Sequence, residues 1–198
     1  MTTITAGTVK ELRERTGAGM MECKKALEET GGDIEAAIDV LRAKGAAKAA
    51  KRAGKEATEG AIGSYVHMGG RIGVLIEVAC ETDFVARTDD FQQLVRDLAM
   101  HIAASNPLGV SEADVAPEVV ERERSVFLEQ VKNEGKPEAM HDKIVDGKIK
   151  RFFKESTLMA QPFVKDPERT IEQLVTDVSA KTGERIVIRR FARFELGA

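Results

Sequence analysis

The sequence is poor in the residues on which several classes of site depend. It has no Trp, one Tyr and three His among its 198 residues. Its two cysteines, Cys23 and Cys80, lie in different segments without CxxC spacing, which indicates neither a disulfide framework nor a zinc knuckle. We expect both to be small buried hydrophobic residues.

Long apolar runs are missing too. The start of the chain, Met1 to Ile4, lacks the charged and apolar regions of a signal peptide. The longest apolar stretch, around Val74 to Ile76, is far shorter than the roughly 20 residues of a membrane-spanning helix. The sequence therefore predicts a cytoplasmic protein that does not contact a membrane.

Neither sign of charge dominates. Lys and Arg number 30 and Asp and Glu 33, so that a formal net charge of -3 provides no field to attract nucleic acid. Basic strands interleaved with aromatic residues, which could stack on bases, are also missing. At three- and four-residue spacing, one local basic stripe on a helical face consists of Lys44, Lys48, Lys51, Arg52 and Lys55. It fits a solvated alanine-rich connector about as well as a phosphate- or acid-binding face.

The sequence contains few candidate catalytic residues. His67, His101 and His141 are expected on a strand, a helix end and a helix, with no HExxH, GxSxG, Walker or dinucleotide motif near them. A lone histidine of this kind is more often structural or exposed than catalytic. We therefore expect no enzyme, no bound cofactor and no metal site.

What the sequence does contain begins with three short helical patterns before residue 55. The first helix has two candidate caps, either Thr5 or Thr8 with Glu11 as a capping box. The residues predicted to face inward are Met20, Cys23 and Leu27 in the second helix and Ile34, Ile38 and Leu41 in the third. Apolar residues larger than alanine then disappear, so a linker is expected from about Lys44 to Lys55.

From Gly60 the period changes to two, which is typical of a strand. Residues 62–68 and 72–80 alternate on either side of Gly69-Gly70, a turn able to take positive φ, and so predict a β-hairpin. A third strand is expected near the end of the chain, which would complete a small antiparallel sheet. Its inward residues are predicted to be Ile186, Ile188, Ala192 and Phe194.

Four helical patterns lie between the second and third strands. A helix from Phe91 to Ile102 carries an apolar stripe that can cover the hairpin. Two further helices, joined around Gly135, predict an antiparallel helical hairpin at about 117–158. The last helix is expected to open at Asp166-Pro167 and to stop at Gly183.

These elements predict an α+β protein with two domains. Residues 1–54 would form a three-helix module with its linker. Residues 55–198 would form a core domain in which helices pack on a three-stranded antiparallel sheet and which carries the helical hairpin.

The stretch from Glu81 to Phe91 holds two helix caps in succession. Thr82 can begin a short turn that carries Asp83 and Phe84, and Thr88 or Asp89 can cap the longer helix. Phe84 lies outside the apolar stripe of that helix, where a large aromatic residue can anchor a partner. It can also fill the local core, and spacing alone favours this second interpretation.

Two segments resemble the signatures of a known family, elongation factor Ts. The first consists of residues 9–21, VKELRERTGAGMM, with residues 23–27, CKKAL, and the second is residues 82–86, TDFVA. The likeness extends through residues 161–166, QPFVKD, and so covers nearly the whole chain. Both signatures occur in the family's order, which makes chance agreement implausible.

The resemblance implies a guanine-nucleotide exchange factor of protein biosynthesis, without catalytic chemistry of its own. The chain would bind elongation factor Tu with GDP, disturb the Mg²⁺ site and promote GDP release until GTP binds. The residues that would reach the Mg²⁺ region are Thr82, Asp83, Phe84 and Val85, with Asp83 and Phe84 at the tip. The first helices would form a ubiquitin-associated-like module that docks on the partner's G domain through Leu12, Arg13, Met20 and Met21.

Longer members of the family carry a second core-like repeat, whereas this sequence has one sheet and one helical hairpin. It resembles the short form, which implies that two copies pair through the terminal strand or the helical hairpin.

Two other functions stay open on the residues alone. The chain could be a helical adaptor that binds another protein through its first module, or a small nucleic-acid binder that uses the basic stripe. An adaptor would not require the turn with Phe84, and a nucleic-acid binder should lose affinity steeply as salt rises. The two signatures favour the exchange factor, which would not contact nucleic acid directly.

Overall fold

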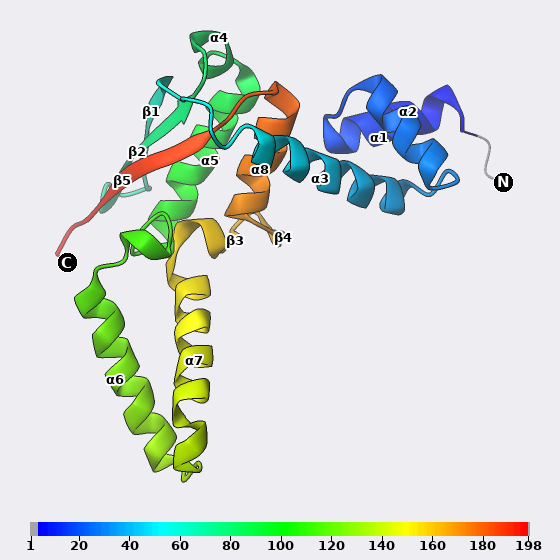
Figure 1. Ribbon diagram of the computed structural model, residues 1–198. Coiled ribbons are helices and arrows are strands. Elements are labelled where there is room, and N and C mark those ends of the chain that lie inside the picture. Colours follow the sequence, from blue (N-terminus) through cyan, green and yellow to red (C-terminus); the bar gives the residue numbers. More distant parts are fainter. Residues whose placement is uncertain (1–3, 198) are drawn as a thin grey trace. The chain divides into compact units, whose positions relative to one another are not determined.

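The computed structural model describes residues 4–197 and combines helices with a small antiparallel sheet, which confirms the predicted α+β class (Figure 1). The chain divides into two compact units. The first holds the chain up to Ala61 together with Val78–Leu94 and Gln173–Val187. The second holds Ile62–Glu77, Val95–Glu172 and the chain from Ile188 on.

The predicted three-helix module is confirmed in the first unit. Its helices are α1 (Ala6–Thr16), α2 (Met20–Glu29) and α3 (Ile34–Lys51). Thr5 is the cap of α1, because its hydroxyl accepts from the Thr8 backbone N–H at 3.2 Å and its own N–H donates to the Thr8 hydroxyl at 3.0 Å. The core of the module consists of Val9, Leu12, Cys23, Ala26, Leu27 and Ala37.

One prediction about the module is wrong. Met20 was expected to face inward, but its side chain is 46% exposed because it starts α2, beyond the turns that the core covers. The stretch from Lys44, expected to carry its basic residues on one helical stripe, is helical as far as Lys51. Alanine and lysine favour a helix, and Gly45 of this stretch is buried so close to Ala180 that a Cβ on Gly45 would lie 3.2 Å from that side chain.

The sheet has the strand order β1-β2-β5, with β1 at Glu59–Val66, β2 at Ile72–Cys80 and β5 at Val187–Glu195. The predicted hairpin is confirmed, and Gly69 and Gly70 take φ values of 86° and 67°, which side chains with a Cβ resist. The buried residues of β2 are Val74, Ile76, Val78, Ala79 and Cys80.

The alternation of β5 shifts by one residue, so part of its predicted inward face is wrong. Ile188 is buried as expected, but Ala192 is exposed and Phe194 is 66% exposed. Arg189 and Arg190 are both exposed, and beyond them the Arg193 side chain turns inward, where its Nε donates to the Ala103 carbonyl at 3.3 Å. Because neighbouring strand residues point to opposite faces, this places Phe194 outward.

Two helices follow β2. The short α4 covers Asp83–Ala86, and α5 covers Asp89–Ser105. Thr88 caps α5, because its hydroxyl accepts from the Phe91 backbone N–H at 3.3 Å. The predicted stripe of α5 is buried at Phe91, Leu94, Val95, Leu98 and Ile102.

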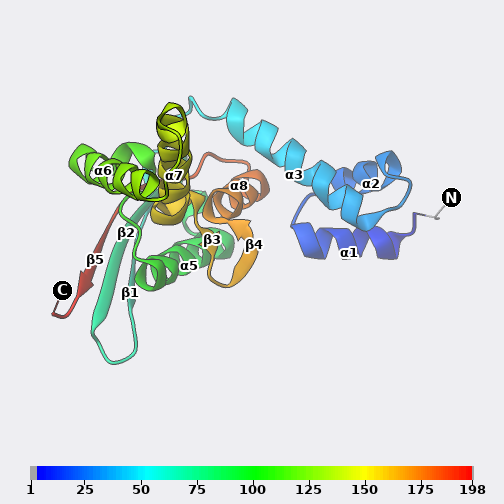
Figure 2. The same ribbon diagram turned by 90° about the horizontal axis from the view of Figure 1, so that it is seen from below.

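The helical hairpin consists of α6 (Pro117–Asn133) and α7 (His141–Ser156), which lie side by side (Figure 2). Its core is small, with Val131, Val145 and Ile149 buried. Three short 3-10 helices, η1 (Glu112–Asp114), η2 (Glu138–Met140) and η3 (Leu158–Ala160), connect the surrounding segments.

The predicted start of the last helix is wrong. Residues Asp166–Thr170 form β4, which pairs with β3 (Pro162–Phe163), and α8 covers Ile171–Thr182. The antiparallel pairing with β3 holds this segment extended, and at its end the Ile171 N–H donates to the Gln161 carbonyl at 3.0 Å. The predicted stop at Gly183 is confirmed, since its N–H donates to the Ser179 carbonyl at 2.9 Å.

Candidate partner-binding site

The turn formed by Thr82–Val85, called the α4 turn below, presents an aromatic side chain to solvent. Phe84 is 79% exposed, whereas Val85 is buried. The Thr82 hydroxyl accepts from the Val85 N–H at 3.4 Å, and an ion pair of 2.9 Å joins Asp83 to Arg87 one turn later. The interpretation of Phe84 as a core residue is therefore wrong.

The exposed ring of Phe84 contributes little to the stability of the fold. Burial of a phenylalanine side chain typically contributes about 1.5–3 kcal/mol, and this ring forgoes most of that. Val85 and Ala86 already supply the buried side of the short helix. An aromatic side chain left in solvent on a capped turn fits an anchor for a partner.

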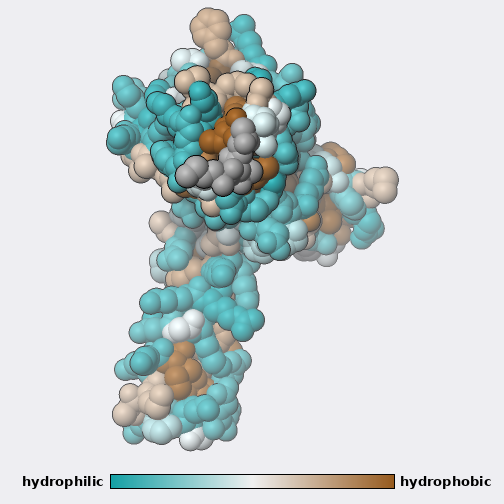
Figure 3. Space-filling model, turned by 90° about the vertical axis from the view of Figure 1, so that its right-hand side faces the viewer, coloured by the Kyte–Doolittle hydropathy of each residue, from teal (hydrophilic) through white to brown (hydrophobic). Residues whose placement is uncertain are grey.

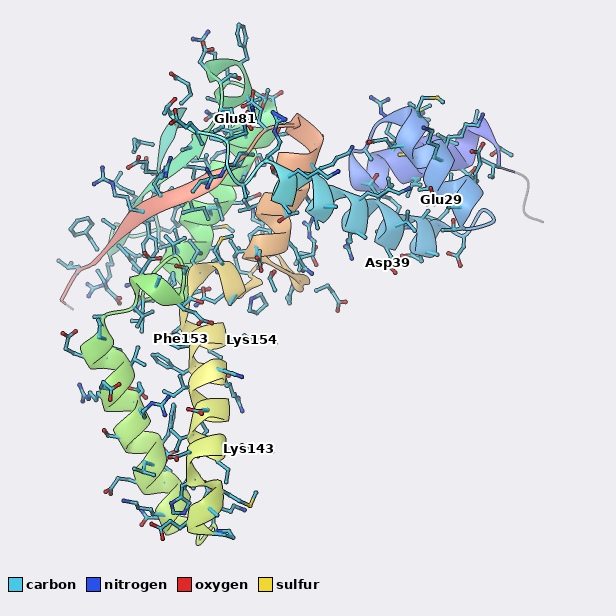
Figure 4. The ribbon with its side chains drawn as sticks, in the orientation of Figure 1. Glu29, Asp39, Glu81, Lys143, Phe153 and Lys154 are labelled. Carbon is cyan, nitrogen blue, oxygen red and sulfur yellow. The ribbon has the colours of Figure 1, made fainter. Side chains whose placement is uncertain are left out.

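Two carboxylates hold the base of the α4 turn. Glu184 accepts from the backbone N–H groups of Glu81 and Thr82, at 3.1 and 3.0 Å, and from the Thr82 hydroxyl at 2.6 Å. Glu81, labelled in Figure 4, accepts two hydrogen bonds from the Arg52 guanidinium, at 2.9 and 3.1 Å, and one from the Arg185 N–H at 2.7 Å. Arg52 first, and then the Arg185 N–H, hold the pKa of Glu81 below its ordinary value.

Cys80 adds a further hydrogen bond at this base. Its thiol donates to the Thr82 carbonyl at 3.1 Å. Burial, and then the nearby charge of Glu184, raise the pKa of Cys80 to about 11, so the thiol stays protonated at neutral pH. Because the thiolate is the nucleophilic form, Cys80 supports the turn and supplies no reactive group.

The second predicted set of site residues lies in the three-helix module and divides into two kinds. Leu12 is fully buried in the module core. Arg13 is exposed, and Met20 and Met21 expose 46% and 65% of their surface at the start of α2. Figure 3 views the module end-on and shows hydrophobic side chains at its surface. Arg13 and the two methionines can therefore contact a partner directly, whereas Leu12 supports the surface from within.

Acidic residues of the same unit neutralise much of the basic stripe. Lys44 pairs with Glu29, labelled in Figure 4, at 2.7 Å, Lys48 pairs with Glu22, and Arg52 pairs with Glu81. Hydrogen bonding to Lys48 lowers the pKa of Glu22. These pairs favour the connector interpretation of the stripe over a phosphate-binding face.

The three histidines have structural partners within the described range. The Tyr65 hydroxyl lies 3.0 Å from His67 Nδ1, and His141 Nε2 lies 2.8 Å from the Lys136 carbonyl. His101 is fully buried, with Nε2 2.9 Å from Gln161 Oε1 and Nδ1 accepting from the Val164 N–H at 3.3 Å. Each of the three rings therefore has a hydrogen-bonding partner within the chain.

Residues 4–197 contain no cluster of three or more His, Cys, Asp or Glu side chains that could hold a metal ion. None of the helices in that range has the length and hydrophobicity required to cross a membrane.

Comparison with known proteins finds relatives along the whole chain. The family model described as "Elongation factor TS" matches residues 4–198. The chain is 60% identical over 197 residues to elongation factor Ts of Desulfosudis oleivorans, with 100% of both chains covered. It is 57% identical over 195 residues to elongation factor Ts of Syntrophobacter fumaroxidans, with 98% of each covered. For elongation factor Ts of Thermoanaerobacter sp. strain X514 the identity is 57% over 194 residues, with 98% of this chain and 95% of the relative covered.

Proposed function

The chain belongs to the elongation factor Ts family, and from this premise we propose that it is a guanine-nucleotide exchange factor for elongation factor Tu. Family membership supports a role in translation elongation and a factor that promotes exchange rather than an enzyme. The observation that carries the proposal is the 79% exposure of Phe84 on a capped turn.

The mechanism is a displacement at the partner's metal site. Mg²⁺ demands near-octahedral oxygen ligands and bridges the nucleotide phosphates to the protein. Small shifts of the surrounding elements therefore weaken the binding of both the ion and the nucleotide. In the proposal Phe84 enters this region with Asp83 beside it, and Thr82 and Val85 hold the turn in shape. GDP then leaves, and the free site takes up GTP.

Linkage determines the size of the effect. If the chain binds the nucleotide-free GTPase more tightly than the GDP-bound form, the bound chain must lower the affinity of the GTPase for GDP by the same factor. Each tenfold difference corresponds to about 1.4 kcal/mol. The chain thus accelerates exchange without changing its final equilibrium.

In the same proposal the three-helix module binds the partner's G domain. Arg13, Met20 and Met21 form the contact, and Leu12 supports it from the core. Methionine suits such a surface because its unbranched thioether adapts to the shape of a partner. The action takes place in the cytoplasm and requires neither nucleic acid nor a membrane.

The proposal includes a homodimer formed through the outward face of the sheet. Its exposed apolar residues come from three adjacent strands and are Ile62, Val66, Leu75 and Phe194. An ion pair of 2.7 Å between Arg190 and Glu77 lies among these strands. Exposed apolar surface of this kind marks interaction sites, and a second copy would cover it symmetrically. Of the two predicted interfaces, this observation favours the terminal strand.

The test is the release of a fluorescent GDP analogue from elongation factor Tu. The labelled complex is mixed with excess unlabelled GDP, with and without the chain, and the fall in fluorescence is timed. We expect release to become faster as the chain is added and to reach a plateau, because the complex saturates. An unchanged release rate at every concentration would contradict the proposal, and an effect that needs added RNA would favour the nucleic-acid binder.

A further inference from the structure

We propose that Arg52, Glu81 and Glu184 are positioning residues for nucleotide exchange, which fix the α4 turn and tie it to the end of α3. The inference rests on the proposed function and adds to it a means by which the three-helix module and Phe84 act together. None of the three side chains would touch the partner's nucleotide.

Glu184 replaces the backbone partners that the α4 turn lacks. The helix α4 has four residues, too few to be stable alone, and the hydrogen bond that the Val85 N–H donates to the hydroxyl of its cap Thr82 is long, at 3.4 Å. Glu184 accepts the N–H groups of Glu81 and Thr82 and also orients the Thr82 hydroxyl. Hydrogen bonds to a charged group are about twice as strong as neutral ones, so this carboxylate decides how firmly the turn is held.

The backbone of Glu184 is itself fixed. It follows Gly183, the stop of α8, and its carbonyl accepts a hydrogen bond from the Ser179 hydroxyl. The carboxylate therefore reaches the α4 turn from the ordered end of a helix.

Arg52 and Glu81 connect the turn to the three-helix module. Arg52 is the residue directly after α3, and its guanidinium makes two hydrogen bonds to Glu81 at the end of β2. The Glu81 side chain is only 15% exposed, so solvent screens its charge less than that of a fully exposed carboxylate. Arg185 closes the arrangement, since its N–H donates to Glu81 and its guanidinium donates to the Lys55 carbonyl at 2.5 Å.

The arrangement has a mechanical consequence. Phe84 is mostly in solvent, so its own packing does little to hold it. Without a fixed base the ring would sample many positions, and binding energy gained by the module would not be directed into the partner's Mg²⁺ region. The inferred residues therefore affect the rate of release from the bound complex more than the binding of the chain.

The experiment compares Glu184→Gln, Arg52→Gln and Glu129→Gln in the fluorescent-GDP assay over a range of chain concentrations. Glu129 is exposed on α6, and its variant is the matched control for loss of one carboxylate. We expect Glu184→Gln and Arg52→Gln to lower the plateau rate about tenfold, in line with loss of charged hydrogen bonds, with half-saturation changed less than about twofold. Glu129→Gln should match the wild type.

A second arm separates positioning from general stability. In a Phe84→Ala background, Glu184→Gln should cause little further loss, because the ring that it positions is gone. An equal loss in both backgrounds would overturn the inference, as would a wild-type plateau rate in Glu184→Gln. A wild-type chain that does not accelerate release would refute the proposed function and this inference together, whereas the preceding outcomes refute the inference alone.

Discussion

Phe84 combines two properties that rarely occur together, a large aromatic ring and nearly full exposure on a well-capped turn. The turn is held through Thr82, Glu81 and Glu184, and Val85 faces the interior. Removal of the ring should therefore leave the structure of the turn in place. This separates the contribution of Phe84 to a partner from its contribution to the fold.

The first prediction concerns the variant Phe84→Ala. We expect a loss of about 2 kcal/mol or more in productive engagement, as for other aromatic anchors, which corresponds to a roughly thirtyfold lower rate of GDP release at subsaturating chain concentration. The midpoint of thermal unfolding should stay within a few degrees of the wild type. Leu108→Ala, which truncates a half-exposed apolar residue outside the α4 turn, is the control. Extensive unfolding of the Phe84→Ala chain would instead show that the ring stabilises the core.

The second prediction concerns His101. Burial lowers the pKa of His101 below its ordinary 6.5, and the hydrogen bond to Gln161 offsets this only in part. Because the unfolded chain then binds the proton more readily, the contribution of His101 to the free energy of unfolding is fully present above pH 6.5. It should fall by up to about 1.4 kcal/mol per pH unit as the pH decreases from 6.5 towards the folded-state pKa.

Denaturant titrations at several values of pH between 7 and 5 measure this dependence. His101→Gln should be less stable at pH 7 but show a shallower decline, because the group whose pKa burial lowers is gone. Parallel curves for His101→Gln and the wild type would show that other groups cause the decline.

At the scale of elements, the three-helix module has an apolar core of its own. The proposed boundary at residue 54 therefore predicts that the chain from Lys55 to Ala198 folds without the module. We expect such a chain to keep a cooperative unfolding transition but to bind elongation factor Tu much more weakly, which circular dichroism and the release assay can measure. The isolated residues 1–54 should show helical circular dichroism. Loss of the cooperative transition in the shortened chain would place the boundary elsewhere.

The element β5 shows why a strand can keep its place while its exposed face changes. The predicted strand is present, and its pairing with β2 is confirmed by the sheet order. The shift at Arg189 and Arg190 exchanges the two faces for the remaining residues, since the side-chain period of a strand is two. The result is that Phe194 joins Val66 on the exposed apolar face.

At the scale of the whole molecule, this exposed face predicts the oligomeric state. The wild-type chain should sediment as a dimer, and Phe194→Glu should shift it to the monomer, because burial of an unpaired charge in the interface is costly. Leu108→Glu introduces the same charge outside the face and should remain dimeric. Sedimentation of wild type and Phe194→Glu at the same rate would contradict a dimer formed through this face.

The sequence by itself determined most of the elements of this protein and its family. Periods of 3.6 and 2, turn glycines and caps such as Asp33 and Thr82 depend on residues a few positions apart, which act in any surroundings. The two signature segments likewise lie in the chain as continuous stretches. The α+β class, the β-hairpin, the helical hairpin and the candidate turn could therefore be predicted.

Only the tertiary structure decided which side chains are exposed and which charges are paired. Arg52 meets Glu81 across 29 residues, and Thr82 meets Glu184 across 102 residues. Pairing with β3 likewise holds residues 166–170 as β4 instead of helix, and ion pairs neutralise much of the basic stripe. The physical reason is that burial and ion pairing depend on neighbours brought together by folding, and local periodicity carries no record of them.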